Sequence, residues 1–203
     1  MDLYIKGVPP VATNRSTAKL MKTGQTTSYR TGDDGDLEAG RNVDFFTLAE
    51  NNPFGNTNRF TDELGGQTYT NNIVIDWSTY NGSTVLGWRR TDNGSNITWA
   101  NAIDGALLVT IGTFTSGWRL PNIQELFSLI NFSDAVTLSL NYSPFNLSLA
   151  RIYWTSTTPK NNTTGAFSLD NSTLTISPAG KTSSTSYRYI PCRTFTVTGT
   201  TLS

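Results

Sequence analysis

Residues 116–130 constrain the fold of this chain more than any other segment. A glycine turn leads into Trp118, and Pro121 stands where a helix would begin, because the missing N–H of proline costs nothing at that position. Apolar side chains then recur at Ile123, Leu126, Phe127 and Ile130. This spacing places them on one face of a helix, so the segment predicts a helix that packs against a core and stops at Asn131.

A second helix is predicted at residues 97–106, where the same spacing recurs. Its apolar face comprises Trp99, Ala102, Ile103 and Ala106. Before this helix, residues 73–75 are all apolar and β-branched and indicate a short buried strand. The glycine pair at 65–66 indicates a hairpin turn, and the Asn-Gly pairs at 81–82 and 93–94 mark two more turns.

Strands dominate the end of the chain. The β-prone runs stand at residues 151–156, 165–170, 172–177 and 187–197. A tight turn at Asp170-Asn171 separates the second run from the third, and Pro191 indicates that the last strand lies at an edge or carries a bulge. Two short helices with antiparallel strands predict an α+β domain, which we place at residues 31–203.

Residues 1–30 are predicted to form an extended N-terminal arm. Prolines and threonines are spread through this segment, and its apolar residues follow no helical or strand period. Because such an arm cannot bury itself, we expect it to anchor the chain to other proteins or to contact other subunits.

The surface is expected to be neutral and polar. Lys and Arg total 15, Asp and Glu total 15, and charged residues make up only 15% of the chain. Nucleic-acid binding needs a basic surplus, so no nucleic-acid partner is expected, and sulfated polysaccharides are disfavoured for the same reason. No run of about 18 apolar residues is present, so we expect no membrane insertion.

Two features bear on where the chain is made. Its first ten residues lack the charged start, apolar stretch and cleavage site of a signal peptide, and its single cysteine, Cys192, cannot form an intramolecular disulfide. Both predict synthesis in a reducing cytoplasm without export. A phage structural protein would fit, because it assembles in the cytoplasm and leaves by lysis.

No enzyme is predicted. The chain has no histidine, which excludes Ser–His–Asp and Cys–His nucleophile systems and histidine metal sites. Cys192 is expected to be a small core residue rather than a reactive thiol. A hydrolytic carboxylate pair stays open, although its candidates Asp104, Glu125 and Asp134 show no pattern that favours one.

In the order of these elements, the chain resembles the C-terminal domain family of the Legionella collagen-like adhesin, found in bacterial surface and phage proteins. The matching motifs, over about residues 22–197, are Lys22-Thr-Gly-Gln-Thr-Thr-Ser-Tyr29, Gly32-Asp-Asp-Gly-Asp36, Asn58-Arg-Phe-Thr-Asp62, Ile97-Thr-Trp-Ala-Asn-Ala102, Trp118-Arg-Leu-Pro121 with Glu125-Leu126, Tyr153-Trp-Thr-Ser156 and Tyr189-Ile-Pro-Cys-Arg193. The resemblance implies a C-type-lectin-like fold and a role in binding rather than catalysis.

The sequence also departs from that family. Ile73-Val-Ile-Asp-Trp77 stands where the family often has Gly-Leu-Met-Trp, and there is no collagen-like Gly-X-Y repeat. The Legionella adhesin binds sulfated polysaccharide, but this neutral chain lacks the basic surplus that would favour such a ligand, so that ligand is not carried over. The related formylglycine-generating enzymes use a cysteine pair, which one cysteine cannot supply.

An acidic loop gives the candidate metal site. Asp33, Asp34 and Asp36, with Glu38 nearby, could supply oxygen ligands to Ca²⁺. Their spacing is not that of an EF-hand. The alternative is a turn in which the aspartates accept hydrogen bonds from their own backbone.

The candidate ligand contacts are Tyr142, Tyr187, Arg188 and Tyr189. The tyrosines lie among serines, threonines and asparagines, and aromatic rings beside hydroxyls and amides suit recognition of a sugar or a protein surface. Residues 181–189 also resemble in composition the receptor-binding segments of phage tropism determinants with C-type-lectin-like folds. A flexible polar loop or an exposed β-face would have the same composition.

We therefore interpret the chain as a non-enzymatic phage virion surface protein, such as a tail-fibre tip, a head fibre or a decoration protein. It would contact a host cell-surface glycan or protein, bind other virion proteins through its arm, and form homotrimers. Two alternatives stay open. One is a bacterial surface adhesin domain trimmed of its export signal, and the other is a purely structural capsid or tail component.

Overall fold

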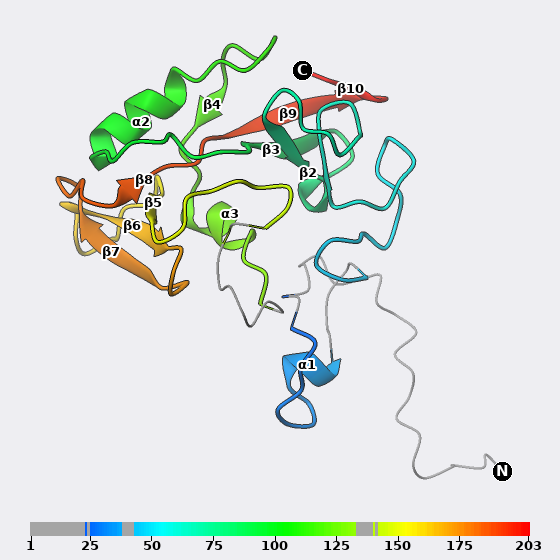
Figure 1. Cartoon of the computed structure of the whole chain (residues 1–203), viewed down its shortest axis with the longest axis horizontal. Coiled ribbons are helices and arrows are strands. Elements are labelled where there is room, and N and C mark those ends of the chain that lie inside the picture. Colours follow the sequence, from blue (N-terminus) through cyan, green and yellow to red (C-terminus); the bar gives the residue numbers. More distant parts are fainter. Residues whose placement is uncertain (1–22, 24, 38–42, 133–139, 141) are drawn as a thin grey trace.

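Two sheets and a few short helices form the body of the protein in the computed structural model, which describes residues 23, 25–37, 43–132, 140 and 142–203 (Figure 1). The elements are α1 (Asp34–Leu37), β1 (Phe60–Thr61), β2 (Ile73–Asp76), η2 (Trp77–Thr79), β3 (Thr84–Arg89), α2 (Trp99–Leu107), β4 (Trp118–Arg119), α3 (Ile123–Phe127), β5 (Ile152–Trp154), β6 (Gly165–Asp170), β7 (Ile176–Gly180), β8 (Tyr187–Arg188), β9 (Cys192–Thr198) and β10 (Thr201–Leu202). The predicted α+β class is confirmed.

The first sheet has the order β1-β2-β3-β9-β10, and β4 also pairs with β9. All these pairs are antiparallel; in the longest of them, Val85 of β3 lies opposite Phe195 of β9. Every residue of β2 is buried, which confirms the buried strand predicted at residues 73–75. Both faces of β2, the second strand in this order, are therefore covered by other parts of the protein.

The second sheet has the order β7-β6-β5-β8, with β8 parallel to β5 and the other pairs antiparallel. The strand predicted at 172–177 begins only at Ile176, because Asp170 accepts hydrogen bonds from Ser172 and extends the turn. The single strand predicted at 187–197 is also wrong. Pro191, which has no N–H to donate, separates β8 in one sheet from β9 in the other.

The predicted helix at 97–106 is confirmed as α2, whose Ala102 and Ala106 pack in a cluster with Trp154. The helix expected to begin at Pro121 instead begins at Ile123. Asn122 is its N-cap: the Asn122 side chain accepts from the N–H of Glu125 at 2.9 Å, and the Glu125 carboxylate accepts from the N–H of Asn122 at 2.8 Å. This capping box moves the start past the proline.

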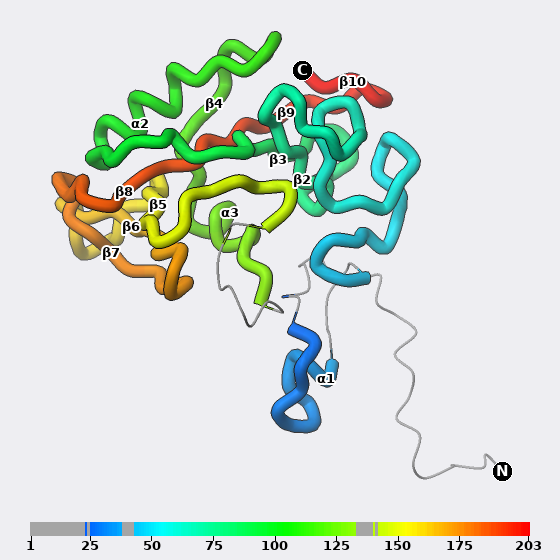
Figure 2. The backbone as a smooth tube through the Cα atoms, in the orientation of Figure 1, coloured from blue at the N-terminus to red at the C-terminus, as the bar shows by residue number. Residues whose placement is uncertain are grey.

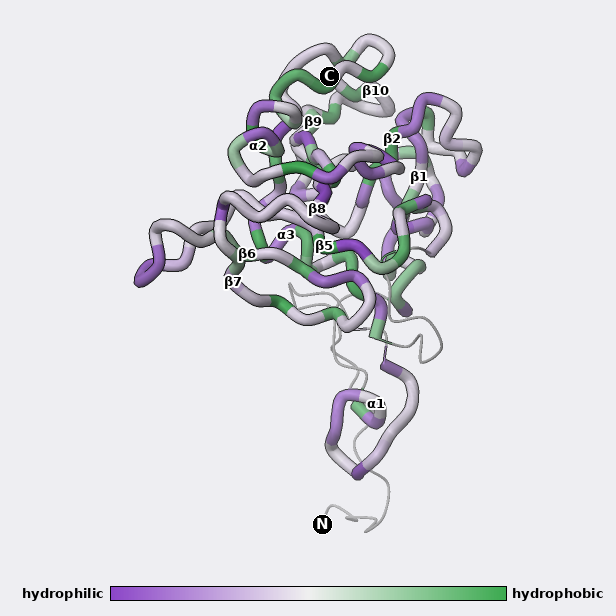
Figure 3. Tube along the Cα trace, turned by 60° about the vertical axis from the view of Figure 1, so that its left-hand side comes forward, coloured by the Kyte–Doolittle hydropathy of each residue, from purple (hydrophilic) through white to green (hydrophobic). Residues whose placement is uncertain are grey.

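The N-terminal part of the described chain projects from the body. Residues 25–37, which include α1, lie apart from the two sheets in Figures 1 and 3, and they begin next to Thr23, whose carbonyl accepts from the N–H of Phe132 at 3.0 Å. Most of the predicted arm, residues 1–22 and 24, lies outside the described residues. The predicted boundary after residue 30 falls inside the projecting segment.

Loops make up much of the body, and Figure 2 shows that the chain from residue 43 to β2 follows one side of it as a series of loops. The core inside is aromatic. Trp77, Trp118 and Trp154 are buried, as expected, while Trp99 is partly buried and donates from Nε1 to the carbonyl of Thr155 at 2.8 Å. Figure 3 shows the more apolar stretches within the body and a mostly hydrophilic projecting segment.

Cys192 is completely buried in the core, as predicted. Burial raises the pKa of its thiol well above the ordinary value, so the reactive thiolate is disfavoured. Within the part that the structure describes, no helix combines the length and apolar character needed to cross a bilayer.

Candidate functional site

Tyr142, the first of the predicted ligand contacts, packs inside an aromatic cluster. Its ring lies 5.5 Å from that of Phe45 and 5.6 Å from that of Phe145, measured between centroids. Its hydroxyl donates to the carbonyl of Leu129 at 2.6 Å, and burial raises its pKa. These contacts account for Tyr142 as part of the core.

Tyr187 and Tyr189 lie against a neighbouring cluster instead. The ring of Tyr187 stacks on that of Trp154, with centroids 4.3 Å apart and planes at 21°. Tyr189 is only 6% exposed, and its hydroxyl faces α2 at Gly105, where an added Cβ would lie 2.6 Å from it. The structure therefore brings these two tyrosines together with α2 and places Tyr142 elsewhere.

Arg188 belongs to a hydrogen-bonded network centred on Asp92. Its Nη1 donates to Oδ1 of Asp92 at 3.0 Å and also to the hydroxyl of Ser148. The same carboxylate accepts from the hydroxyl of Tyr153 at 3.1 Å and from the N–H of Gly94 at 2.8 Å. The network joins β5 and β8 to the loop after β3, so Arg188 has a clear structural partner, and a ligand role for it stays a prediction.

Asp62, Asp92 and Glu125 are among the carboxyl groups whose pKa values are lowered in the folded protein. Burial alone would raise each pKa. Hydrogen bonds to the ionised form outweigh burial: backbone N–H groups donate to Asp62 and Asp92, and Arg119 donates to Glu125 at 2.6 and 2.8 Å.

These lowered values predict an acid-sensitive fold. Since the unfolded chain binds more protons than the folded one, the stability from these groups is complete above the unfolded pKa of about 4 and is lost as pH falls through the lower folded values. We expect the thermal midpoint to fall steadily between about pH 5 and about pH 2. Asp92→Asn should flatten this dependence, whereas the exposed Asp104→Asn should not. A wild-type midpoint that is flat or rises across this range would contradict the account.

The predicted calcium loop folds back on its own backbone. The Asp33 carboxylate accepts from the N–H groups of Tyr29 at 2.6 Å and Arg30 at 3.0 Å, and the Asp36 carboxylate accepts from that of Gly32 at 2.7 Å. The Tyr29 bond is the main reason that the pKa of Asp33 is lowered. Asp34 accepts instead from the hydroxyl of Thr23.

The geometry of that loop matches the alternative stated for it, a turn whose aspartates bind their own backbone. Within the residues that the structure describes, no group of three or more His, Cys, Asp or Glu side chains is arranged to hold a metal ion. Calcium binding by Asp33, Asp34 and Asp36 gains no support from this arrangement.

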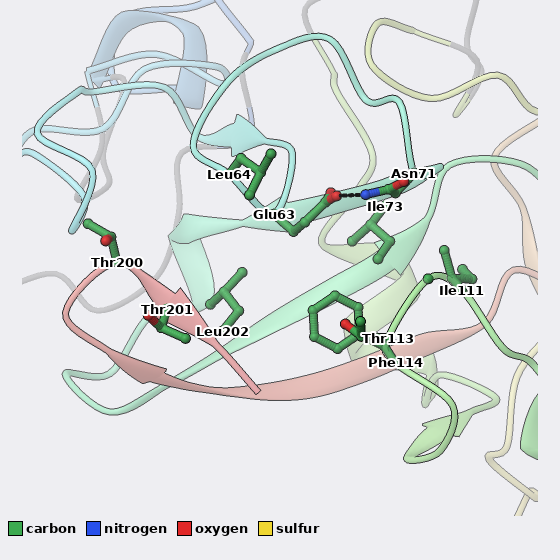
Figure 4. A pocket seen from close by; sticks show the side chains of 11 residues that line it. Glu63, Leu64, Asn71, Ile73, Ile111, Thr113, Phe114, Thr200, Thr201 and Leu202 are labelled. Carbon is green, nitrogen blue, oxygen red and sulfur yellow. Dashed lines mark hydrogen bonds between the residues drawn. The ribbon is translucent and has the colours of Figure 1, made fainter.

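A pocket of about 380 Å³ lies beside the end of the first sheet (Figure 4). Three turns surround it: the connection between β1 and β2, the short hairpin at 111–114, and the turn into β10. Its lining consists of Glu63, Leu64, Asn71, Ile73, Ile111, Gly112, Thr113, Phe114, Thr200, Thr201 and Leu202. Within this lining Ile73 and Leu202 are buried, whereas the threonines and Leu64 are exposed.

Local chemistry holds each of these turns in place. In the first, the Asp62 carboxylate accepts from the N–H of Gly66 at 2.7 Å and from the hydroxyl of Thr68 at 3.0 Å. In the other two, Gly112 and Gly199 adopt φ of +57° and +60°, which glycine accepts at no steric cost. The walls of the pocket are therefore formed before any ligand arrives, which reduces the entropic cost of binding.

Phe114 anchors the hairpin wall. Its ring meets that of Phe195 edge-on at 4.9 Å, and the guanidinium of Arg193 lies 5.0 Å from the ring centroid. Phe114 remains partly exposed and forms part of the pocket lining. One aromatic ring is thus held in the wall while part of its surface is available to a ligand.

Glu63 is the chemically distinctive residue of the pocket. It is 9% exposed, and its Oε1 accepts from the amide of Asn71 across the β1–β2 connection (Figure 4). Its Oε2 is buried and has no hydrogen-bond partner among the described residues. Such a carboxylate oxygen is costly to bury, and a bound donor would relieve that cost.

Little in the amino-acid sequence indicates this site. Glu63 follows Asp62 directly and shows no motif of its own, and the flanking turns at 111–114 and 198–201 are about 50 and 135 residues further along the chain. Pairing of β10 with β9, of β9 with β3 and of β3 with β2 brings the first and last of these segments together, and Phe114 holds the 111–114 hairpin against Phe195 of β9. The glycine turn signals at 112 and 199 could have marked two of the three walls.

Comparison with known proteins identifies the family. Searches of curated proteins and of solved structures found no match. The family model of the Lcl C-terminal domain matches residues 78–191, which is more than half of the chain. That range includes α2, α3, β5 and the Asp92 network, together with the 111–114 wall of the pocket. The chain therefore belongs to the Lcl C-terminal domain family.

Proposed function

We propose that this chain is a non-enzymatic binding domain on the surface of a phage virion, where it contacts the host cell envelope through the pocket that contains Glu63. Membership of the Lcl C-terminal domain family indicates a surface-associated, adhesin-like protein. The observation that carries the proposal is the preformed pocket, with its buried and unpaired carboxylate oxygen. We extend the proposal to a C-type-lectin-like arrangement of the two sheets and to homotrimers.

The position of the pocket supports a contact role. Figures 1 and 3 place β10, which lines the pocket, at the end of the body opposite the projecting α1 segment. If the chain is attached to the particle through its N-terminal arm, the pocket faces away from the particle. An adhesive site needs that orientation, whereas a purely structural component does not.

Side-chain chemistry supports binding over catalysis. The chain has no histidine, and Cys192 is buried with a raised thiol pKa. Glu125, a candidate for a hydrolytic pair, serves instead in a capping box and an ion pair with Arg119, with N···O 2.6 Å. Asp104, another candidate, is exposed on α2.

The proposal predicts saturable attachment of the chain to cells. Fluorescently labelled full-length protein should bind intact cells of a susceptible bacterium, and unlabelled protein should block adsorption of the phage that encodes it. The control is the same protein after heat unfolding, which should neither bind nor block. A folded, labelled chain that attaches to no susceptible cell would refute a receptor-binding role and favour the structural alternative.

A bacterial surface adhesin remains the second candidate, because family membership alone indicates a surface-associated protein. The neighbourhood of the gene discriminates between the two. Adjacent tail or capsid genes would favour the virion, whereas an upstream continuation of the reading frame that encodes an export signal would favour the bacterial surface.

A further inference from the structure

We infer that the pocket containing Glu63 binds one ring of a saccharide that carries free hydroxyl or amino groups and no sulfate or carboxylate. This inference rests on the proposed function in one respect: it takes the sugar to be part of a cell envelope. The pocket itself is defined by the structure and can be tested without cells.

The first argument is the unpaired oxygen of Glu63. Oε2 accepts no hydrogen bond from any described residue, while Oε1 is occupied by the amide of Asn71. A carboxylate oxygen accepts strongly from hydroxyl and ammonium donors, both of which sugars supply. Because Oε2 is buried, we expect the carboxylate to turn about its terminal torsion, which is soft in glutamate, to meet the ligand.

The second argument is the mixture of surfaces in one small space. Ile73, Leu202 and Phe114 give the lining an apolar surface, and the exposed Thr113, Thr200 and Thr201 add hydroxyl groups to it. A pyranose ring has C–H groups on its faces and hydroxyls around its edge, so it matches both surfaces together. The volume of about 380 Å³ accommodates one sugar ring rather than an extended oligosaccharide.

The third argument is charge. Among the described residues that line the pocket there is no Lys or Arg, and the one ionisable side chain is the Glu63 carboxylate. A sulfated or carboxylated sugar would place a like charge against it in a partly desolvated site, which is unfavourable. The site therefore selects against the anionic sugars that a basic surface would attract.

The test is a titration of the isotopically labelled full chain, followed by amide chemical shifts. The probes are glucose, glucosamine, N-acetylglucosamine and galactose, with glucose 6-sulfate as the anionic comparison. We expect at least one of the first four to shift the amides of residues 63–64, 71, 111–114 and 200–202 saturably. Glucose 6-sulfate should bind these residues at least about tenfold more weakly.

Substitutions define the part played by Glu63. Glu63→Gln keeps the shape and removes the charge, and we expect it to weaken binding about tenfold, as loss of a hydrogen bond to a charged acceptor does. The matched control is Glu50→Gln, an exposed glutamate outside the pocket lining. A second pair of variants is Leu64→Ser and its control, Leu108→Ser. The Leu64 side chain is 78% exposed and lines the pocket, whereas the Leu108 side chain is 79% exposed and lies outside the lining. Exposed positions keep the fold intact, so a loss of binding in Leu64→Ser reports the site.

Each outcome decides the inference. Saturable shifts at the pocket that Glu63→Gln weakens would support it. Shifts elsewhere, no shifts with any of the uncharged or amino sugars, or equal binding of glucose 6-sulfate would overturn it. If the chain attaches to cells and Glu63→Gln attaches equally well, the contact with the cell does not use this pocket, and the titration alone then decides whether the pocket binds sugar. If the pocket binds sugar but the chain attaches to no cell, the receptor role fails alone.

Discussion

Replacing Arg59 by methionine is expected to lower the free energy of unfolding by about 3–5 kcal/mol, because it leaves a buried carboxylate without its partner. Arg59 and Asp76 are both completely buried side chains. Nε and Nη2 of Arg59 donate to the two carboxylate oxygens of Asp76 at 2.9 and 2.8 Å. Although burial disfavours the charged guanidinium, Asp76 outweighs it and raises the pKa of Arg59.

The same arginine also connects three parts of the body. Its Nη2 donates to the carbonyl of Ser128, just after α3, at 2.8 Å, and its guanidinium lies over the rings of both Phe45 and Phe60, at 4.4 and 4.5 Å from their centroids. A methionine could fill much of this space but could make none of the hydrogen bonds. The loss of stability should therefore come from electrostatics and hydrogen bonding rather than from poorer packing.

Urea unfolding of a double-mutant cycle measures this effect. Arg59→Met and Asp76→Asn should each be strongly destabilising, and the double variant should lose much less than the sum of the two, because neither charge is then left alone. Arg30→Met, at an exposed arginine, is the control and should change little. Additive losses would show that the ion pair does not act as a unit.

Replacing Asp92 by alanine should lower the free energy of unfolding by about 3 kcal/mol, since it removes the acceptor at the centre of a partly buried network. Arg188, whose side chain is 14% exposed, would lose its ion pair, and the hydroxyl of Tyr153 would lose one of its two contacts. The measurement is the free energy of unfolding from a denaturant titration, and its slope with denaturant concentration should be unchanged. The exposed Asp104→Ala is the matched control.

The same network separates two roles for Arg188. If its contacts with Asp92 and Ser148 are its main function, Arg188→Gln should destabilise the protein, and Asp92→Asn should add little further loss in its presence. A variant that keeps its stability but loses attachment to cells would instead support the ligand contact predicted from the sequence.

Secondary structure could be predicted where periodicity and burial agree. The helix at 97–106 and the strand at 73–75 were correct because a single apolar pattern determines each. The start of α3 was missed because the reciprocal hydrogen bonds of Asn122 and Glu125 outweigh the preference of proline for the first turn. The switch of sheets at Pro191 depends on pairings between distant strands, which local patterns do not encode.

The site was harder to predict than the fold. The polar neighbours of the tyrosines after residue 140 favour a recognition surface, whereas tertiary packing leaves Tyr142 partly buried in an aromatic cluster and Tyr189 only 6% exposed. Glu63 had no distinguishing neighbours in sequence, and its unpaired oxygen is a property of the folded loop. Composition therefore predicted a polar binding protein, whereas only the strand pairing of the folded chain defined the pocket.

The most direct test of the account compares attachment of three labelled full-length proteins to susceptible cells: the wild type, Glu63→Gln and Glu50→Gln. We predict that the wild type and Glu50→Gln bind saturably and block phage adsorption equally, while Glu63→Gln does both about tenfold less well. Equal binding by all three proteins, with their folds intact, would contradict the claim that this pocket makes the contact with the host.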